Sequence, residues 1–254
     1  MSDILTHAEA GVMTVTINRV DKKNSITSAM YAAMADAVKL AADEASIRVL
    51  AFQGHETVFC AGNDIGDFIK NPPAAADSPV FLFLRGIAQF PKPLIAGASG
   101  AAVGIGTTML LHCDLVYAGD NAVFAMPFVN LGICPEAASS LLLPQMLGFH
   151  RAAEALLLGD SFKADAALQM GLVNRVVPAA EVNALVQTQA RKLAAKPPSS
   201  LRETKRLMKK GQAALVMRQM ADEGAVFARM LKEPAAREAF AAFMEKRKPD
   251  FSRV

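Results

Sequence analysis

The chain has 254 residues, 52% of them hydrophobic, so it is long enough to bury a substantial core in one large domain. Its net charge of +3 is small, and no basic stripe interleaves with aromatic residues, which argues against a nucleic-acid partner. The three cysteines lie far apart and the four histidines are dispersed, so we expect reduced thiols and no metal site. The first residues lack the pattern of a signal peptide. These features predict a cytoplasmic protein.

Strand and helix patterns alternate along most of the chain. Apolar and β-branched runs predict strands over residues 12–18, 48–53, 94–98, 114–118 and 172–177. Apolar residues at helical spacing predict helices over residues 24–45, 79–89, 107–112, 139–147, 151–158 and 164–170, with loops at 71–76 and turns at 59–64 and 100–106. From residue 179 onwards the pattern is helical, with breaks at 196–198, at Gly211 and near Pro234. We therefore predict an α/β core over residues 1–196 and a helical region over residues 197–254.

One apolar segment could be taken for a membrane span. Residues 94–111 carry no charge over 18 positions. The segment also contains four glycines together with Ser and Thr. A buried strand and a buried helix, divided by the glycines, account for it better than a span, so we expect no membrane partner.

Glu136 is the only carboxylate in the segment 121–150, which contains no Asp, Lys or Arg. We expect this segment to be largely buried, and apolar surroundings disfavour the ionised form of a carboxyl group. A Glu in that environment can carry protons near neutral pH. Alternatively, Pro135 and Glu136 open a helix, where the helix dipole favours a carboxylate. The segment by itself leaves both interpretations open.

Two glycine-rich turns are the other candidates for chemistry. The turn over residues 100–106 lacks both a Walker-type Gly-Lys-Ser/Thr and a Gly-x-Gly-x-x-Gly, which argues against a nucleotide site. Backbone N–H groups at such turns can instead hold negative charge that develops on a substrate oxygen. Residues 61–64 and 103–106 both fit this use. Together with Glu136 they suggest two amide donors for an oxyanion and one base.

Five successive motifs resemble the crotonase (enoyl-CoA hydratase/isomerase) superfamily over roughly residues 10–250. They are Phe59-Cys-Ala-Gly-Asn-Asp-Ile, Pro91-Lys-Pro-Leu-Ile-Ala, Gly100-Ala-Ala-Val-Gly-Ile-Gly, Cys113-Asp-Leu-Val-Tyr-Ala and Ala167-Leu-Gln-Met-Gly-Leu-Val. The resemblance implies a spiral of ββα units with a C-terminal helical region that forms homotrimers, or hexamers as dimers of trimers. It also implies acyl-CoA thioester substrates, no separate cofactor, and an oxyanion hole made by the backbone amides of Asn63 and Ile105.

The resemblance also separates two reactions. Hydratases of the superfamily carry two glutamates, and the matching positions here are Thr108 and Phe128, neither of which transfers protons as a carboxyl would. The run 131–140, with its Pro135-Glu136, is similar to the Δ3,Δ2-enoyl-CoA isomerases, in which a Glu at this position is the sole acid/base. This implies an isomerase of fatty acid oxidation, with Phe124, Phe128 and Leu131 keeping water from Glu136. The rival interpretations are a hydratase or another crotonase reaction, and a non-catalytic acyl-CoA-binding protein.

The same resemblance extends to the substrate-binding residues. Lys22 and Lys23 match a CoA-binding segment, whereas Phe243, Lys246 and Arg247 are weaker candidates, and an ordinary solvated role is an equal alternative for the charged ones. The remaining candidates are Asn24, Ala61, Gly62, Asp64, Ile65, Val103, Gly104, Thr108, Pro127, Phe128 and Leu131. Asp64 is expected to brace its turn, and the thiols of Cys60 and Cys134 to fill the core.

Overall fold

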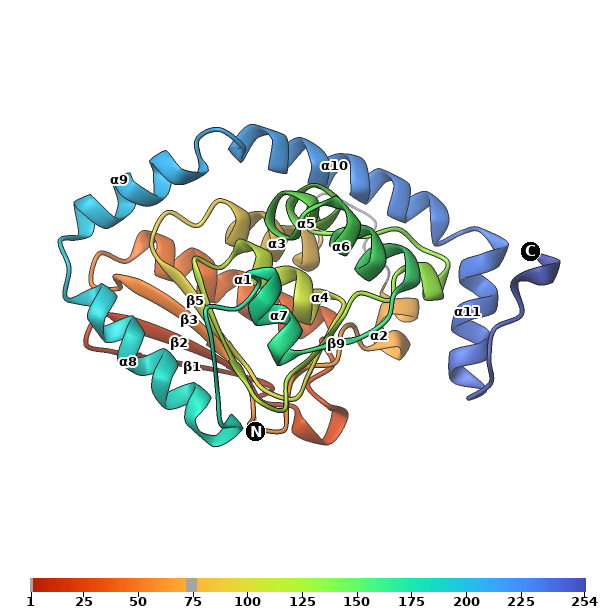
Figure 1. Ribbon diagram of the computed structural model, residues 1–254, viewed down its shortest axis with the longest axis horizontal. Coiled ribbons are helices and arrows are strands. Elements are labelled where there is room, and N and C mark those ends of the chain that lie inside the picture. The colour runs from red at the N-terminus through yellow and green to blue at the C-terminus, as the bar shows by residue number, and fades with distance from the viewer. Residues whose placement is uncertain (1, 72–76) are drawn as a thin grey trace.

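The computed structural model describes residues 2–71 and 77–254, and its centre is a six-stranded sheet. The strand order is β1-β2-β3-β5-β7-β10, and all neighbours are parallel except β1 and β2. The strands are β1 (Ile4–Glu9), β2 (Val12–Ile17), β3 (Val49–Gln53), β5 (Leu94–Ala98), β7 (Leu115–Gly119) and β10 (Arg175–Val177). Helix α8 (Val182–Ala194) covers one face, whereas α1 (Ser28–Asp43) and α3 (Pro79–Ala88) lie on the other (Figure 1).

The strands of a second, four-stranded sheet alternate along the chain with strands of the first sheet. Its order is β4 (Val58–Cys60), β6 (Ala101–Val103), β8 (Val123–Ala125) and β9 (Phe162–Lys163). Strands β3, β5 and β7 of the first sheet are each followed by one strand of the second sheet and then by helix. The result is a spiral of ββα units, in which the helices after β4, β6 and β8 are α2 (Ile65–Lys70) with α3, α4 (Ile105–Thr108) and α5 (Ser139–Leu147).

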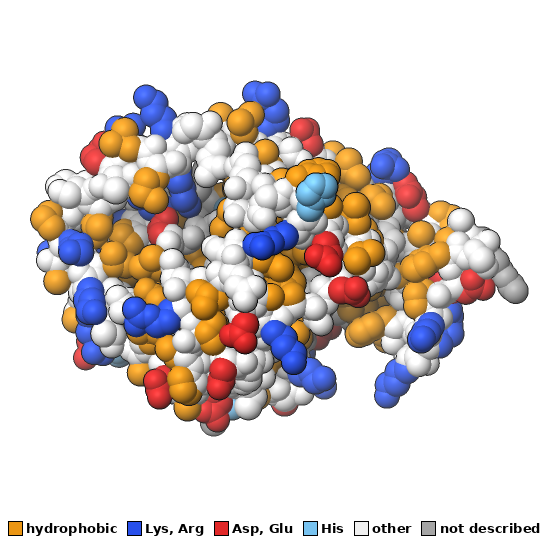
Figure 2. All heavy atoms as spheres, in the orientation of Figure 1, with side chains coloured by type: hydrophobic (Ala, Val, Ile, Leu, Met, Phe, Trp, Pro, Cys, Tyr) orange, Lys and Arg blue, Asp and Glu red, His pale blue; other side chains and the backbone are white. Residues whose placement is uncertain are grey.

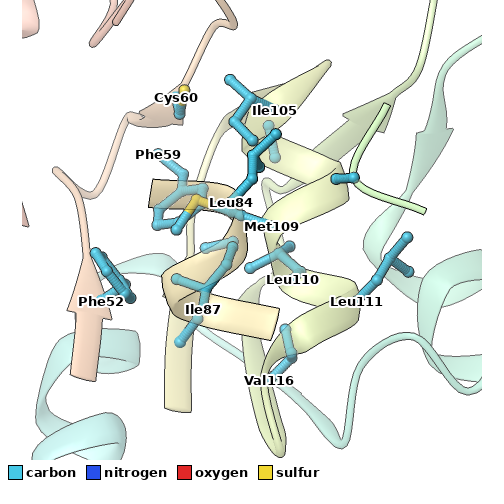
Figure 3. Close-up of a cluster of buried hydrophobic side chains, with 14 of the residues drawn as sticks. Phe52, Phe59, Cys60, Leu84, Ile87, Ile105, Met109, Leu110, Leu111 and Val116 are labelled. Carbon is cyan, nitrogen blue, oxygen red and sulfur yellow. The ribbon is translucent and has the colours of Figure 1, made fainter. Parts of the chain in front are cut away.

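The main core lies between the sheets and the helices that follow them. Apolar residues of α1 recur at helical spacing, and Met30, Met34 and Val38 are buried by this packing. Figure 3 shows how Phe52, Leu84 and Met109 come together from a strand, from α3 and from the turn after α4. Ile105 and Cys60 lie at one end of this cluster (Figure 3), so the core directly supports both glycine-rich turns.

The C-terminal helices α9 (Pro198–Lys209), α10 (Ala213–Met230) and α11 (Pro234–Met244) form an arc over the body of the molecule (Figure 1). Lys205 ties α9 to the core, because its Nζ lies 2.7 Å from Oδ2 of Asp114 and 2.7 Å from the carbonyl oxygen of Lys92. Helix α10 passes over α3 and α5, and α11 lies at the far end beside a hollow in the surface (Figures 1 and 2).

The sequence predicted strands β2, β3, β5 and β7 of the first sheet, but it missed β1 and all strands of the second sheet. The strands over 12–18, 48–53, 94–98 and 114–118 are confirmed within two residues, as are the helix over 79–89 and the breaks in the C-terminal tail. The turn predicted over 100–106 contains β6, the helix over 24–45 begins only at Ser28, and the strand over 172–177 shrinks to β10. Strands of two or three residues are too short to show a period of two.

Two other expectations concern the same elements. The segment 94–111, considered as a membrane span, is divided into β5, β6, α4 and a 3₁₀ turn over Met109–His112. No helix of the described residues has both the length and the apolar character needed to cross a bilayer. The loop predicted over 71–76 lies, apart from Asn71, outside the described residues. The division of the chain at residues 196 and 197 stays a prediction.

Candidate active site

The two glycine-rich turns lie against each other, and the glycines permit this approach. A Cβ on Gly106 would come within 2.5 Å of the carbonyl oxygen of Cys60, and one on Gly62 within 3.2 Å of that of Val103. Gly62 and Gly104 also have positive φ angles, of 95° and 55°, which L-residues with side chains rarely adopt. The ends of β4 and β6 can therefore approach each other only because Gly62 and Gly106 have no side chains.

The backbone N–H groups of Asn63 and Ile105 have no hydrogen-bond acceptor among the residues that the structure describes. Ile105 is the first residue of α4, where a helix leaves its N–H groups free. Both residues line one cavity of about 290 Å³, together with Glu136. We call it the turn cavity. It brings together predicted site residues Ala61, Gly62, Asn63, Ile65, Val103, Gly104, Ile105, Pro127, Phe128, Leu131, Glu136 and Phe243.

Glu136 lies in a tight turn that leads into α5. Ala137 and Ala138 both have left-handed backbone conformations, with φ angles of 60° and 56°. The hydroxyl of Ser139 donates to the carbonyl oxygen of Glu136 at 2.6 Å, and Nε2 of His112 donates to that of Ala137 at 2.8 Å. Ala138 is the N-cap residue of α5, so Glu136 precedes the helix and does not cap it. The helix-opening interpretation of Glu136 is therefore wrong.

The carboxyl group of Glu136 has a pKa raised to about 7. Burial is the main cause, and the negative charge of Glu223 on α10 adds to it. The hydroxyl of Thr108, 3.4 Å from Oε1, acts in the opposite direction. Glu136 is thus isolated in the sequence but has a second carboxylate as its neighbour in space, which the sequence did not predict. Its environment allows it to gain and lose a proton near neutral pH.

A second cavity, of about 400 Å³, meets the first at Glu136. We call it the helix cavity because it lies between α3 and α10. Asn63, Phe68, Glu136 and Phe227 line both cavities. The rest of the helix cavity is mainly apolar, with Val80, Phe81 and Leu84 from α3 and Met217, Met220, Ala221, Gly224 and Ala228 from α10. Glu136 and Asn63 therefore stand at the junction of two mainly apolar cavities, of which the smaller also contains the free N–H groups of Asn63 and Ile105.

Several predicted site residues do not line these cavities. Lys22 and Lys23 are exposed on a 3₁₀ turn (Val20–Lys22), and Lys246 is exposed beyond α11. Asn24 is buried, and its amide nitrogen donates to the carbonyl oxygens of Val58 and Phe59 at 3.1 and 3.0 Å. Asp64 caps α2 and pairs with Arg19 at 2.8 Å. This agrees with the expected bracing role of Asp64 and gives Asn24 a structural role too.

Other residues of the predicted site have local partners. Arg247 forms ion pairs with Glu238 and Glu245, so its charge is already matched. Phe124 stacks on Phe162 with ring centroids 5.7 Å apart and does not line either cavity, so its predicted place beside Glu136 is wrong. The thiols of Cys60 and Cys134 have pKa values raised to about 12 and 11, chiefly by burial, which keeps them neutral.

Four residues around Glu136 were not predicted from the sequence. Tyr31 donates a hydrogen bond to Oδ1 of Asn63, and Phe68 and Phe227 line both cavities. Glu223 is buried on a helix that is otherwise largely exposed. Each comes from an element distant in the chain, and only Glu223 differs from its surroundings in a way that the helical pattern could have suggested.

The two-sheet spiral is the class of fold that the sequence motifs predicted, that of the crotonase superfamily. Residues 7–253 match the family model described as enoyl-CoA hydratase/isomerase, and the chain belongs to this family. An enoyl-CoA hydratase/isomerase from Pseudoalteromonas atlantica T6c has the same fold, with a TM-score of 0.94, 37% identity, and coverage of 99% of this chain and 100% of that one. The predicted family and fold are thus confirmed.

The similar curated proteins differ in their reactions. The chain is 38% identical to enoyl-CoA delta isomerase 2 of Rattus norvegicus over 82% of its own length, although it spans only 55% of that relative. It is 32% identical to 2,3-dehydroadipyl-CoA hydratase of Escherichia coli K12 over 99% of both chains. Family membership therefore defines an enzyme class that includes both isomerases and hydratases.

Proposed function

We propose that the protein is a Δ3,Δ2-enoyl-CoA isomerase that serves the oxidation of unsaturated fatty acids. The observation that carries the proposal is the position of Glu136, whose pKa is raised to about 7, beside the unbonded N–H groups of Asn63 and Ile105. An isomerisation needs a group that takes a proton and returns it, and an electrostatic site for the charge that develops in between. One carboxyl group suffices, because no water is added.

In the proposed mechanism, the Glu136 carboxylate removes a proton from C2 of a 3-enoyl-CoA. The electron pair of the broken C–H bond moves into a dienolate, and the N–H groups of Asn63 and Ile105 hold its thioester oxygen. Protonated Glu136 then delivers the proton to C4, the double bond settles between C2 and C3, and Glu136 is again a carboxylate. One oxyanion donor of this kind contributes about 3–4 kcal/mol.

Thr108 and Phe128 favour isomerisation over hydration. Thr108 is buried beside Glu136, and its hydroxyl cannot act as a second carboxyl group. Phe128 lines the turn cavity with an apolar ring where a hydratase would need a polar group for water. The similarity to a delta isomerase supports the same choice.

The two cavities suggest how the substrate lies. We place the thioester in the turn cavity, the alkyl chain in the helix cavity, and C2 to C4 at their junction beside Glu136. The phosphates of CoA then lie outside, near exposed cations such as Lys22 and Lys23. CoA belongs to the substrate, and the mechanism uses no separate cofactor.

The proposal also includes a cytoplasmic homotrimer or a hexamer of two trimers. Phe149, Leu157 and Leu158 form exposed apolar surface on and after α6 (Phe149–Ala153), which is typical of a surface that another subunit covers. Light scattering coupled to gel filtration would measure the mass, and a monomer would contradict this part of the proposal.

A comparison of Glu136→Gln with the wild-type protein tests the reaction. The wild type should convert 3-enoyl-CoA to the conjugated 2-enoyl-CoA, followed by absorbance, and should hydrate 2-enoyl-CoA poorly. Glu136→Gln should lose the isomerisation while it still folds and binds octanoyl-CoA. The exposed Glu154→Gln is the matched control. Near-normal isomerisation by Glu136→Gln, dominant hydration by the wild type, or binding of CoA thioesters without turnover would each contradict the proposal.

A further inference from the structure

Glu223 connects helix α10 to the turn that carries Glu136. Its Oε2 accepts a hydrogen bond from the backbone N–H of Ala138 at 2.6 Å, and its Oε1 accepts one from that of Ser140 at 3.0 Å. The Ser140 hydroxyl also donates to Oε1, and it accepts in turn from Nε2 of Gln219 at 2.8 Å. The side chain of Glu223 thus caps the first turn of α5 from a distant helix.

These contacts select the ionised form of Glu223. The pKa of Glu223 is raised, because its burial outweighs the hydrogen bonds from Ser140 and Ala138, which lower the pKa. All three donors point at oxygen atoms of the carboxyl group, and a group that only accepts hydrogen bonds is a carboxylate. A buried carboxylate therefore lines the helix cavity together with Glu136.

The turn between Glu136 and α5 needs such support. Ala137 and Ala138 hold left-handed conformations, which are unfavourable for alanine. His112 fixes the carbonyl oxygen of Ala137 from the core, and Glu223 fixes the N–H of Ala138 from α10. The backbone on the C-terminal side of Glu136 is therefore held from two opposite elements.

We infer that Glu223 is a positioning residue for Glu136: it holds the Glu136 turn in its left-handed conformation and makes the docking of α10 a condition for a competent base. The inference rests on the proposed function where activity is concerned, since it assumes that Glu136 moves the proton. The same helix supplies Met217, Met220 and Phe227 to the helix cavity. The packing of α10 thus both forms one wall of the helix cavity and holds the turn that carries Glu136.

The charge of Glu223 has a second consequence for Glu136. The other titratable groups that interact with Glu136 are Tyr31 on α1, Cys60 on β4 and Cys134, and raised pKa values keep all three neutral. Arg85 of α3 also lines the helix cavity. The negative charge of Glu223 raises the pKa of Glu136. Its removal should therefore lower the pH at which Glu136 ionises.

The test compares Glu223→Gln with Asp222→Asn, which removes the same charge from an exposed neighbour on α10. Glu223→Gln keeps the volume but replaces one acceptor by a donor, so one N–H of the turn loses its partner. We expect kcat to fall between about tenfold and a hundredfold, with KM nearly unchanged. The acid limb of the pH profile should move to lower pH. Asp222→Asn should resemble the wild type in both measurements.

A readout without turnover separates this inference from the proposed reaction. Carboxyl ¹³C NMR of Glu-labelled protein, with Glu136→Gln to assign the signal, measures the ionisation midpoint of Glu136 directly. That midpoint should fall in Glu223→Gln even if the wild type proves to have another activity. If Glu223→Gln does not fold, Ser140→Ala removes one donor and should lower kcat at constant KM. An unchanged kcat and midpoint, or equal losses of kcat and substrate binding, would overturn the inference.

Discussion

The phenolic hydroxyl of Tyr31 donates a hydrogen bond of 2.6 Å to Oδ1 of Asn63. Asn63 supplies one of the two free N–H groups of the turn cavity, and Tyr31 is buried in the core at the base of α1. The hydrogen bond fixes the side chain of Asn63 and with it the orientation of the peptide group. A hydrogen bond from a core helix thus adds to the β-bridge between Ile26 and Asn63 in holding a turn that lies outside the longer strands and helices.

Tyr31→Phe should lower kcat/KM for the isomerisation by about tenfold, because Asn63 loses its buried partner and its amide becomes less well directed. Steady-state kinetics on a 3-enoyl-CoA measures this loss. Tyr117→Phe is the matched control, since Tyr117 is equally buried but packs beneath α8, away from both cavities. Equal effects of the two substitutions would show that the Tyr31 hydroxyl has no special role.

The pH dependence of the reaction should report on Glu136. The carboxylate form starts the reaction, so kcat/KM should fall as the pH drops through about 7. Thr108→Val removes a hydrogen bond that lowers the pKa of Glu136, and the acid limb should then move slightly to higher pH. If the acid limb of the pH profile instead lay at the pH where an exposed carboxyl group ionises, burial would not raise the pKa of Glu136 to about 7.

Glu136→Gln should stabilise the folded protein at pH 8. The pKa of Glu136 is about 7 in the folded chain, against an ordinary value of 4.5 in the unfolded chain, so the folded state binds the extra proton between these values. Its stabilising contribution is therefore complete below pH 4.5 and is lost as the pH rises through 7, at a cost of about 3 kcal/mol. Denaturant unfolding at pH 5 and pH 8 should show a gain for Glu136→Gln only at pH 8, and none for Glu154→Gln.

Asp114→Ala should destabilise the fold by about 3–5 kcal/mol, because the ammonium of Lys205 would be left buried without its partner. The two side chains are 19% and 8% exposed, and Asp114 also accepts a hydrogen bond from the N–H of Leu94. Urea unfolding measures the loss. Asp43→Ala removes a carboxylate from the exposed pair with Lys39 and should change the stability little.

Met220→Trp should shorten the acyl chain that the enzyme accepts. Met220 lines the helix cavity, and a larger ring there takes up space that the alkyl chain would occupy. Turnover of long-chain 3-enoyl-CoA should fall, whereas that of a six-carbon substrate should change little. Met208→Trp, on the exposed face of α9, controls for the substitution itself. A uniform loss over all chain lengths would contradict the placement of the chain in this cavity.

Local patterns in the sequence were sufficient for the elements that bury a regular face. Strands β2, β3, β5 and β7 and helices α1 and α3 carry apolar runs or periodic apolar residues, and the glycines of 61–64 and 103–106 marked the two turns. Strand β1 buries only Ile4 and was missed. The short strands of the second sheet carried no such period. They form because the ββα units stack, and this stacking is a long-range property.

Glu136 shows most clearly what the sequence determined and what the tertiary structure decided. The sequence by itself identified the residue, because it is the only carboxylate in a segment of thirty residues that contains no Asp, Lys or Arg. Only the tertiary structure decided how it is held and when it ionises. Glu223 lies 85 residues from Ala138 in the chain, and its neighbour Asp222 is a carboxylate too. It is Glu223, however, that caps the turn and raises the pKa of Glu136. Desolvation and Coulomb interactions depend on which groups are near in space, and that proximity arises only when α10 packs over α5.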